Sequence, residues 1–280
     1  MKRIDPFRIS DNSVVGFLAN MFEEGYGYSS INTARAAISS LNDLGSCPLV
    51  CRFMRGVFNL RPSRPRYTFI WDVSIVLNYL RTLSPAAKLN LPMLSAKLVT
   101  LCALVTGHRC QSLHVLDITN MHISSSKAVF YIQTLLKTNS PKNPASVITL
   151  AAYREDRRIC VFICLKQYLK RARLLRTSNQ LFISSQSPHN GVTKDTLARW
   201  IKLTLKKSGI DTSIFKAHST RAAAASAAAR TSDVSLVLRS AGWTKETTFA
   251  KFYNKPIDNN LSQSNFAHSV LKSKSKSVSL

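Results

Sequence analysis

A short segment rich in proline and arginine, RPSRPRY at residues 61–67, divides the sequence. Proline fixes φ and has no amide hydrogen, so such a segment neither continues a helix nor pairs inside a sheet. We expect an extended basic linker at 63–66 that separates an N-terminal domain, 1–62, from a larger domain, 67–262. The alternative is a surface loop within one domain. Residues 263–280, rich in serine and lysine, are expected to form a tail.

Hydrophobic periodicity predicts mostly helices on both sides of this linker. Alternating residues predict two strands at 127–134 and 145–151, joined by a turn at 135–144, with short strand-like pieces over 112–124. The expected fold class is therefore mainly α with a small antiparallel β-sheet (α+β). Helices are predicted over 13–25 (capped by Ser13), 29–41, 49–60, 71–83, 95–107, 161–175, 194–209, 219–229 and 233–242.

The charge of the chain is strongly unbalanced. It has 39 Lys and Arg against 14 Asp and Glu, a formal net charge of +25. Such an excess repels itself unless a polyanion is near, and the nucleic-acid backbone is the commonest such partner. The sequence has neither a long apolar run nor an N-terminal signal peptide, so we expect no membrane partner.

The six cysteines do not have the spacing of a metal site. Cys47 and Cys51, like Cys160 and Cys164, are four residues apart and can share a helix face. A structural zinc ion needs four ligands in tighter local patterns, and no pair of histidines lies close by. We expect reduced thiols in an intracellular protein, with no metal.

A run of alanines gives the first candidate site. In FKAHSTRAAAASAAA, from Phe215, a helix is expected to begin near His218, with Ser219 and Thr220 offering capping hydroxyls. His218 and Arg221 then share one helical face at the positive end of the helix dipole, which suits a phosphate. The alternative is a surface His and Arg on an ordinary amphipathic helix.

Other residues outside this helix carry similar chemistry. Arg109 follows a glycine turn in LVTGHRCQSL, Trp243 follows Gly242, and Tyr253 lies ten residues further on. Lys137 lies in the predicted hairpin turn, where Lys142 is an alternative to it. Three of these residues have a purely structural alternative: Tyr253 as a core aromatic, Trp243 as a packing residue, and the lysine as a solvated charge.

The order of these residues resembles that of the tyrosine recombinases. TGHR is similar to the family's first-arginine turn, HSTR to its His-x-x-Arg box, and AGW…FYNKP to its Trp position and nucleophilic tyrosine. The last third of the chain is similar to recombinases of DIRS-like retrotransposons and related mobile elements. The resemblance covers about 69–256 and implies a two-domain clamp on double-stranded DNA.

The resemblance also implies a chemistry that uses no cofactor. Tyr253 would attack a DNA phosphate to form a 3′-phosphotyrosyl intermediate, while Arg109 and Arg221 hold the non-bridging oxygens. Lys137 would protonate the leaving 5′ oxygen. His218 would bind a phosphate oxygen or accept the phenol proton, and Trp243 would donate from its indole and pack the site.

The family's biology supplies the remaining expectations. It implies a site-specific recombinase for mobile-element integration, acting as a tetramer on two DNA sites (a monomer or dimer without DNA), in the nucleus. The alternatives are a tyrosine-type topoisomerase and an inactive DNA-binding protein of the same fold. Ser112 stands where many members have an acidic residue. The short N-terminal part suggests either a piece of a longer polyprotein or a domain that lacks a helix. SQSNFAHSVLKS near the end is expected to form a helix that docks on a neighbouring protomer.

Overall fold

The computed structural model describes residues 9–41, 47–63, 65–135, 146–240, 247, 249–250 and 253–257. The chain divides into two compact units, Met1–Arg66 and Tyr67–Leu280. The break between them falls at the C-terminal end of the proline- and arginine-rich segment.

The first unit consists of helices. They are α1 (Asp11–Glu23), α2 (Tyr28–Ser39) and α3 (Pro48–Leu60). Their apolar faces meet in a small core that contains Val14, Leu18, Ile31 and Val50. At the end of α3, Arg61 donates from Nη1 to the carbonyl of Phe22, and its Cζ lies 3.8 Å from the centroid of the Phe22 ring. The first arginine of the proline-rich segment therefore packs on α1.

The prediction of the residue that caps α1 is wrong. The hydroxyl of Ser10, not that of Ser13, caps the helix and accepts the amide of Ser13 at 3.3 Å. Both serines suit a helix start, and the segment between them is polar enough to be either loop or first turn.

The second unit is a helical domain with one small sheet. Its elements are α4 (Val73–Thr82), η1 (Ala86–Lys88), α5 (Leu91–Thr106), α6 (Cys110–His114), β1 (Met121–Ile123), β2 (Lys127–Ile132), β3 (Ser146–Ala151), η2 (Arg157–Ile159), α7 (Val161–Ala172), α8 (Lys194–Lys207), α9 (Ser219–Ala228) and α10 (Val234–Ser240). The predicted class, mainly α with a small antiparallel sheet, is confirmed.

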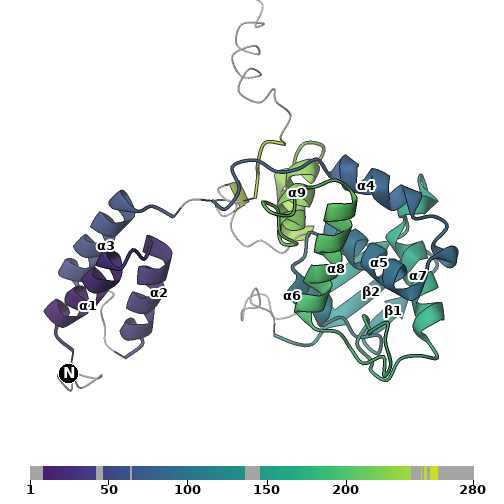
Figure 1. The fold of residues 1–280 in the computed structure, drawn as a ribbon, viewed down its shortest axis with the longest axis horizontal. Helices are drawn as coiled ribbons and strands as arrows, with labels where there is room; N and C mark the ends of the chain where they lie inside the picture. Colours follow the sequence, from purple (N-terminus) through teal and green to yellow (C-terminus); the bar gives the residue numbers. More distant parts are fainter. Residues whose placement is uncertain are drawn as a thin grey trace, which may run out of the picture. The chain divides into compact units, whose positions relative to one another are not determined.

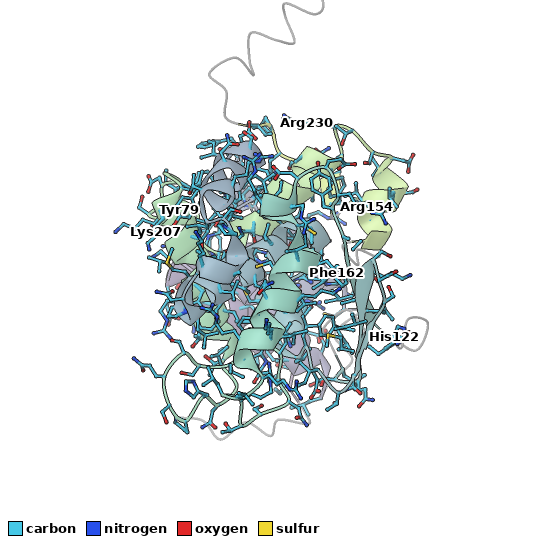
Figure 2. All side chains as sticks on the ribbon, turned by 90° about the vertical axis from the view of Figure 1, so that its right-hand side faces the viewer. Tyr79, His122, Arg154, Phe162, Lys207 and Arg230 are labelled. Carbon is cyan, nitrogen blue, oxygen red and sulfur yellow. The ribbon has the colours of Figure 1, made fainter. Side chains whose placement is uncertain are left out.

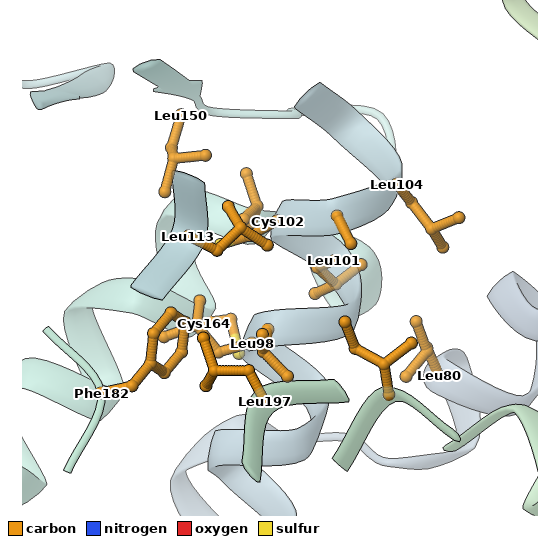
Figure 3. Close-up of a cluster of buried hydrophobic side chains, with 14 of the residues drawn as sticks. Leu80, Leu98, Leu101, Cys102, Leu104, Leu113, Leu150, Cys164, Phe182 and Leu197 are labelled. Carbon is orange, nitrogen blue, oxygen red and sulfur yellow. The ribbon is translucent and has the colours of Figure 1, made fainter. Parts of the chain in front are cut away.

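Helix α5 is the centre of this unit. It is apolar on nearly every face, which is typical of a helix surrounded by protein. Helices α7 and α8 flank it, and β3, α6 and α9 also contact it (Figure 1). Figure 3 shows Leu98, Leu101 and Cys102 of α5 within this core. Around them lie side chains from neighbouring elements, among them Leu80, Leu113, Leu150, Cys164, Phe182 and Leu197.

The sheet has the order β1-β2-β3 and is antiparallel throughout in the part of the chain that the structure describes. Met121 pairs with Phe130, and Phe130 pairs in turn with Ile148. The strand-like reading of 112–124 is wrong at its start, because residues 110–114 form α6. This helix has only five residues, too few for its apolar positions to show a helical period.

One buried cation stabilises the second unit. Lys97 of α5 is 1% exposed, and its Nζ donates to the carbonyls of Leu80, Leu83 and Arg158 at 3.0, 2.6 and 2.7 Å. Burial lowers the pKa of this ammonium. The three carbonyls belong to the end of α4 and to η2, so Lys97 ties both of them to the central helix.

The surface of the second unit carries many basic side chains. Arg154, Lys207 and Arg230, which are labelled in Figure 2, are exposed. Within the described ranges, no helix combines the length and the apolar character needed to cross a bilayer. No disulfide joins the six cysteines, all of which lie in described segments, and burial raises the pKa of Cys164 to about 12.

Candidate active site

The start of α9 is held by contacts that differ from the predicted capping. His218 is the N-cap residue but has helical φ and ψ and makes no side-chain cap bond. The hydroxyl of Ser219 accepts the indole N–H of Trp71 at 2.9 Å, and the hydroxyl of Thr220 donates to the carbonyl of Ala217 at 2.7 Å. The two hydroxyls therefore fix the helix to its surroundings and to the preceding turn.

Arg221 is buried in the middle of the site. Arg221 is 1% exposed, and its Nη1 donates to the backbone carbonyl of Gly107. Gly107 ends α5 in the left-handed conformation, with φ 63°, which glycine adopts without a steric penalty. Two residues later, Arg109 is the N-cap residue of α6 and is partly exposed. One glycine turn thus connects both arginines.

Tyr253 lies beside the start of α9. Its phenol oxygen is 3.4 Å from Nε2 of His218, and the two ring centroids are 6.1 Å apart at an interplanar angle of 71°. The Cζ of Arg221 lies 5.4 Å from the centroid of the Tyr253 ring. Tyr253 is half-buried and His218 is exposed, so the phenol is not enclosed in the apolar core.

The chain after Tyr253 is anchored on the segment that opens the second unit. The amide of Ile70 donates to the carbonyl of Pro256 at 2.9 Å, and Ile70 and Ile257 form a parallel bridge. Trp71, next to Ile70, is the residue that contacts Ser219. The same short segment therefore contacts both the start of α9 and the chain that follows the tyrosine.

Burial and the two arginine charges change the pKa values of groups in the site. Burial, and then the nearby positive charge of Arg109, lower the pKa of Arg221 to about 10. Burial, Arg221 and Arg109 lower the pKa of His108 to about 4, so its imidazole is neutral at physiological pH. The two guanidinium groups repel each other in a partly buried place. An anion bound between them would offset this repulsion, so the site suits an anion.

Of the six predicted site residues, four are described and lie together: Arg109, His218, Arg221 and Tyr253. Lys137, its alternative Lys142, and Trp243 lie outside the described residues, as does the segment SQSNFAHSVLKS. Ser112 is buried in α6, and its amide donates to the carbonyl of Arg109 at 2.9 Å. Among the residues with described positions, no cluster of His, Cys, Asp and Glu is suited to hold a metal ion.

Sequence reasoning missed three residues that lie at the site: His108, Trp71 and Ser226, whose hydroxyl donates to the carbonyl of Tyr253. His108 precedes Arg109 but gave no signal, since a histidine at this place is as compatible with a loop surface as with a site. Trp71 is 148 residues from its partner, Ser219. Ser226 is the one polar residue within the alanine run, which was a usable signal that a hydroxyl is needed there.

No protein-family model and no curated protein sequence matches the chain. Solved structures do match. XerA recombinase is 20% identical with a TM-score of 0.51, covering 95% of this chain and 85% of that one. A lambda integrase dimer bound to a COC′ core site is 16% identical with a TM-score of 0.54, over 91% and 83%.

A third similar structure is the Tn1549 transposon integrase in complex with circular intermediate DNA. It is 14% identical with a TM-score of 0.59, and the alignment covers 93% of this chain and 86% of that one. At these identities the likeness concerns the fold alone. The chain has the mostly helical fold, with its small antiparallel sheet, of the tyrosine recombinases and integrases.

Proposed function

We propose that this chain cleaves and rejoins DNA strands at specific sites, with Tyr253 as the nucleophile. The observation that carries the proposal is the position of the phenol oxygen, 3.4 Å from Nε2 of His218, with the ring close to Arg221. A phenol, an imidazole and two guanidinium groups are the residue types that a phosphodiester transfer without a metal requires. The shared fold with tyrosine recombinases supports this reading.

The proposed step is a transesterification. The phenol oxygen attacks the phosphorus of a backbone phosphodiester, and the bond from phosphorus to the 5′ oxygen breaks. The phenol proton passes to unprotonated Nε2 of His218, and the leaving 5′ oxygen takes a proton from Lys137. The products are a 3′-phosphotyrosyl ester and a free 5′-hydroxyl. Attack by the 5′-hydroxyl of a partner strand reverses the step and releases Tyr253.

The two arginines stabilise the charge that develops in the transition state. Arg221 and Arg109 contact the non-bridging oxygens, whose negative charge grows as the fifth bond to phosphorus forms. Planar guanidinium groups suit this task because two N–H donors meet two oxygens of one phosphate. In this proposal Trp243 packs the site and donates from its indole N–H.

The charge of the chain supports a large DNA surface. A net charge of +25 favours binding of duplex DNA that weakens steeply as salt rises. We propose that the first unit is a helical DNA-binding domain and that copies of the chain assemble on two DNA sites, as a tetramer. The last third of the sequence resembles DIRS-like recombinases, and this favours integration of a mobile element, in the nucleus, as the biological role.

The test is covalent capture of DNA. The probe is a pool of duplexes of random sequence, each nicked so that the short 5′-hydroxyl fragment diffuses away after cleavage and rejoining is blocked. Denaturing gels should show a protein–DNA adduct with the unchanged chain and none with Tyr253→Phe, whose duplex binding should persist. Sequencing of the captured duplexes gives the target site.

Two outcomes would replace the proposal. If the unchanged chain binds duplexes but forms no adduct with any member of the pool, the chain is a DNA-binding protein without this chemistry. If an adduct forms, and supercoiled plasmids that carry the site are relaxed without recombinant products, the chain is a tyrosine-type topoisomerase.

A further inference from the structure

Ser226 connects α9 to the backbone on both sides of Asn254. It is 1% exposed and lies in the alanine run. Its hydroxyl donates to the carbonyl of Tyr253 at 2.6 Å and accepts the amide of Lys255 at 3.0 Å. A serine hydroxyl has one donor and two acceptor positions, so this one group satisfies a carbonyl and an amide of the same short segment.

The backbone of this segment also takes part in hydrogen bonds to other backbone groups, and a residue before it packs in an apolar cluster. Before the tyrosine, the amide of Tyr253 donates to the carbonyl of Phe249 at 2.8 Å, and Phe249 packs with Ala225 and Val237. After it, the carbonyl of Pro256 accepts the amide of Ile70. The bond to Ile70 holds the segment after the tyrosine, and the bond to Phe249 holds the amide of Tyr253. The Ser226 hydroxyl holds the carbonyl of Tyr253 and connects it to α9.

Ser226 and Arg221 are on the same helix. They are five residues apart in α9, so a rigid element about 8 Å long separates the buried guanidinium from the hydroxyl. The alanines between them let α9 lie close to α5, whose last residues lead to Gly107 and the Arg221 bond. The helix therefore fixes one distance on which the chemistry depends, that from the phosphate-binding group to the chain carrying the phenol.

We propose that Ser226 is a positioning residue, whose hydroxyl sets the backbone of Tyr253 relative to Arg221 so that the phenol oxygen meets the phosphate. The inference rests on the proposed function. Ser226 touches neither the phosphate nor the phenol oxygen in this scheme, and it acts only through the backbone of Tyr253. Loss of the hydroxyl lets the tyrosine segment shift, and a displacement of about 1 Å of a reacting group is enough to slow a reaction about a hundredfold.

Two variants and one control separate positioning from general stability. Ser226→Ala removes the hydroxyl, and Ser226→Cys replaces it with a somewhat larger thiol that is a much weaker hydrogen-bonding group. The control is Ser95→Ala, because Ser95 is also fully buried and donates to a helical carbonyl, that of Leu91 at 2.7 Å, but lies on α5 away from the tyrosine segment. All are studied below the lowest of their melting temperatures.

The measurement is the single-turnover rate of adduct formation on a nicked duplex that the unchanged chain captures, with saturating protein. A second duplex carries sulfur in place of the bridging 5′ oxygen, so that the leaving group no longer needs a proton. We expect both Ser226 variants to be slowed about tenfold to a hundredfold on both duplexes, with unchanged duplex binding. The Ser95→Ala rate should equal that of the unchanged chain.

The outcomes distinguish this inference from the proposed function. If the unchanged chain forms no adduct, the proposed function is wrong, and the inference that rests on it is wrong as well. If the unchanged chain forms the adduct and both Ser226 variants match Ser95→Ala, the inference alone is wrong. Restoration of the rate by the sulfur duplex also overturns it, because the defect would then lie in leaving-group protonation. If Ser226→Ala does not fold, the Ser226→Cys variant decides alone: adduct formation at the rate of the unchanged chain would show that the inference is wrong.

Discussion

Nη1 of Arg221 donates a hydrogen bond to the backbone carbonyl of Gly107, across 114 residues of sequence. The bond joins the first turn of α9 to the glycine turn that leads to Arg109. Because a backbone carbonyl holds Arg221, the two arginines keep their places despite their mutual repulsion. Burial, and then this repulsion, lower the pKa of Arg221. The Cζ of the same guanidinium lies 5.4 Å from the centroid of the Tyr253 ring.

Replacing Arg221 by lysine should abolish most of the cleavage. Arg221→Lys keeps a positive charge but loses the planar set of donors that both contacts Gly107 and suits a phosphate. We expect adduct formation about a hundredfold slower or worse, and nearly unchanged duplex binding, since this is one cation among many. Arg230→Lys, at an exposed arginine just after α9, is the matched control. An Arg221→Lys variant that cleaves at the normal rate would refute the role of the guanidinium.

Tyr253 should act within its own protomer. Its phenol lies beside His218 and Arg221 of the same chain, and its backbone is bonded to the helix that carries both. Mixing Tyr253→Phe with Arg221→Ala should therefore give no adduct, because neither protomer holds a complete site. The mixture is assayed on captured duplexes beside each variant alone. Recovery of adduct in the mixture would mean that the tyrosine is donated to a neighbouring protomer.

His108 should make folding sensitive to mild acid. Its pKa falls from 6.5 to about 4 on folding, because of burial and then of the charges of Arg221 and Arg109. Between these pH values the unfolded chain binds the proton and the folded chain does not. The stabilisation from neutral His108 is therefore complete above about pH 7 and is lost as pH falls toward 4, by at most about 3 kcal/mol.

Urea unfolding at a series of pH values measures this contribution. The difference in the free energy of unfolding between the unchanged chain and His108→Gln should change with pH over this window, with the unchanged chain losing more on acidification. His122→Gln, at an exposed histidine on β1, should follow the unchanged chain. Parallel pH dependence of the His108→Gln variant and the unchanged chain would contradict the buried, neutral state of the imidazole.

Lys97 should matter for stability and not for chemistry. Lys97→Met keeps most of the apolar stem but leaves the carbonyls of Leu80, Leu83 and Arg158 without their shared donor. Unsatisfied buried carbonyls are costly, so we expect a loss of about 3 kcal/mol or more in the free energy of unfolding. The folded fraction should still form the adduct. Lys88→Met, at an exposed lysine of η1, is the control, and equal stability of the two variants would disprove this role.

Most helices of the fold were predictable because their apolar spacing is regular. Helix α5 reads as buried from its composition alone, and β2 and β3 read as strands from their alternation. Short elements were not predictable. The five residues of α6 carry too little periodicity, and the choice between Ser10 and Ser13 as a cap depends on one backbone turn.

For the candidate site, the sequence supplied residue types and their order but no distances. Arg109, His218, Arg221 and Tyr253 were predicted together, yet nothing in the sequence says that Gly107 binds Arg221. The hydroxyl of Ser219 was predicted to cap a helix and instead accepts the indole of Trp71, a contact that only the folded chain creates. The roles of Lys137 and Trp243 stay predictions.

The most direct measurement is the identity of the residue that becomes bonded to DNA. The chain has eight tyrosines, so digestion of the captured adduct with protease and nuclease, followed by mass spectrometry, assigns the nucleotide to one of them. We predict that the nucleotide is on the peptide containing Tyr253, attached through its 3′ phosphate. A nucleotide on any other tyrosine, or on a serine, would contradict it.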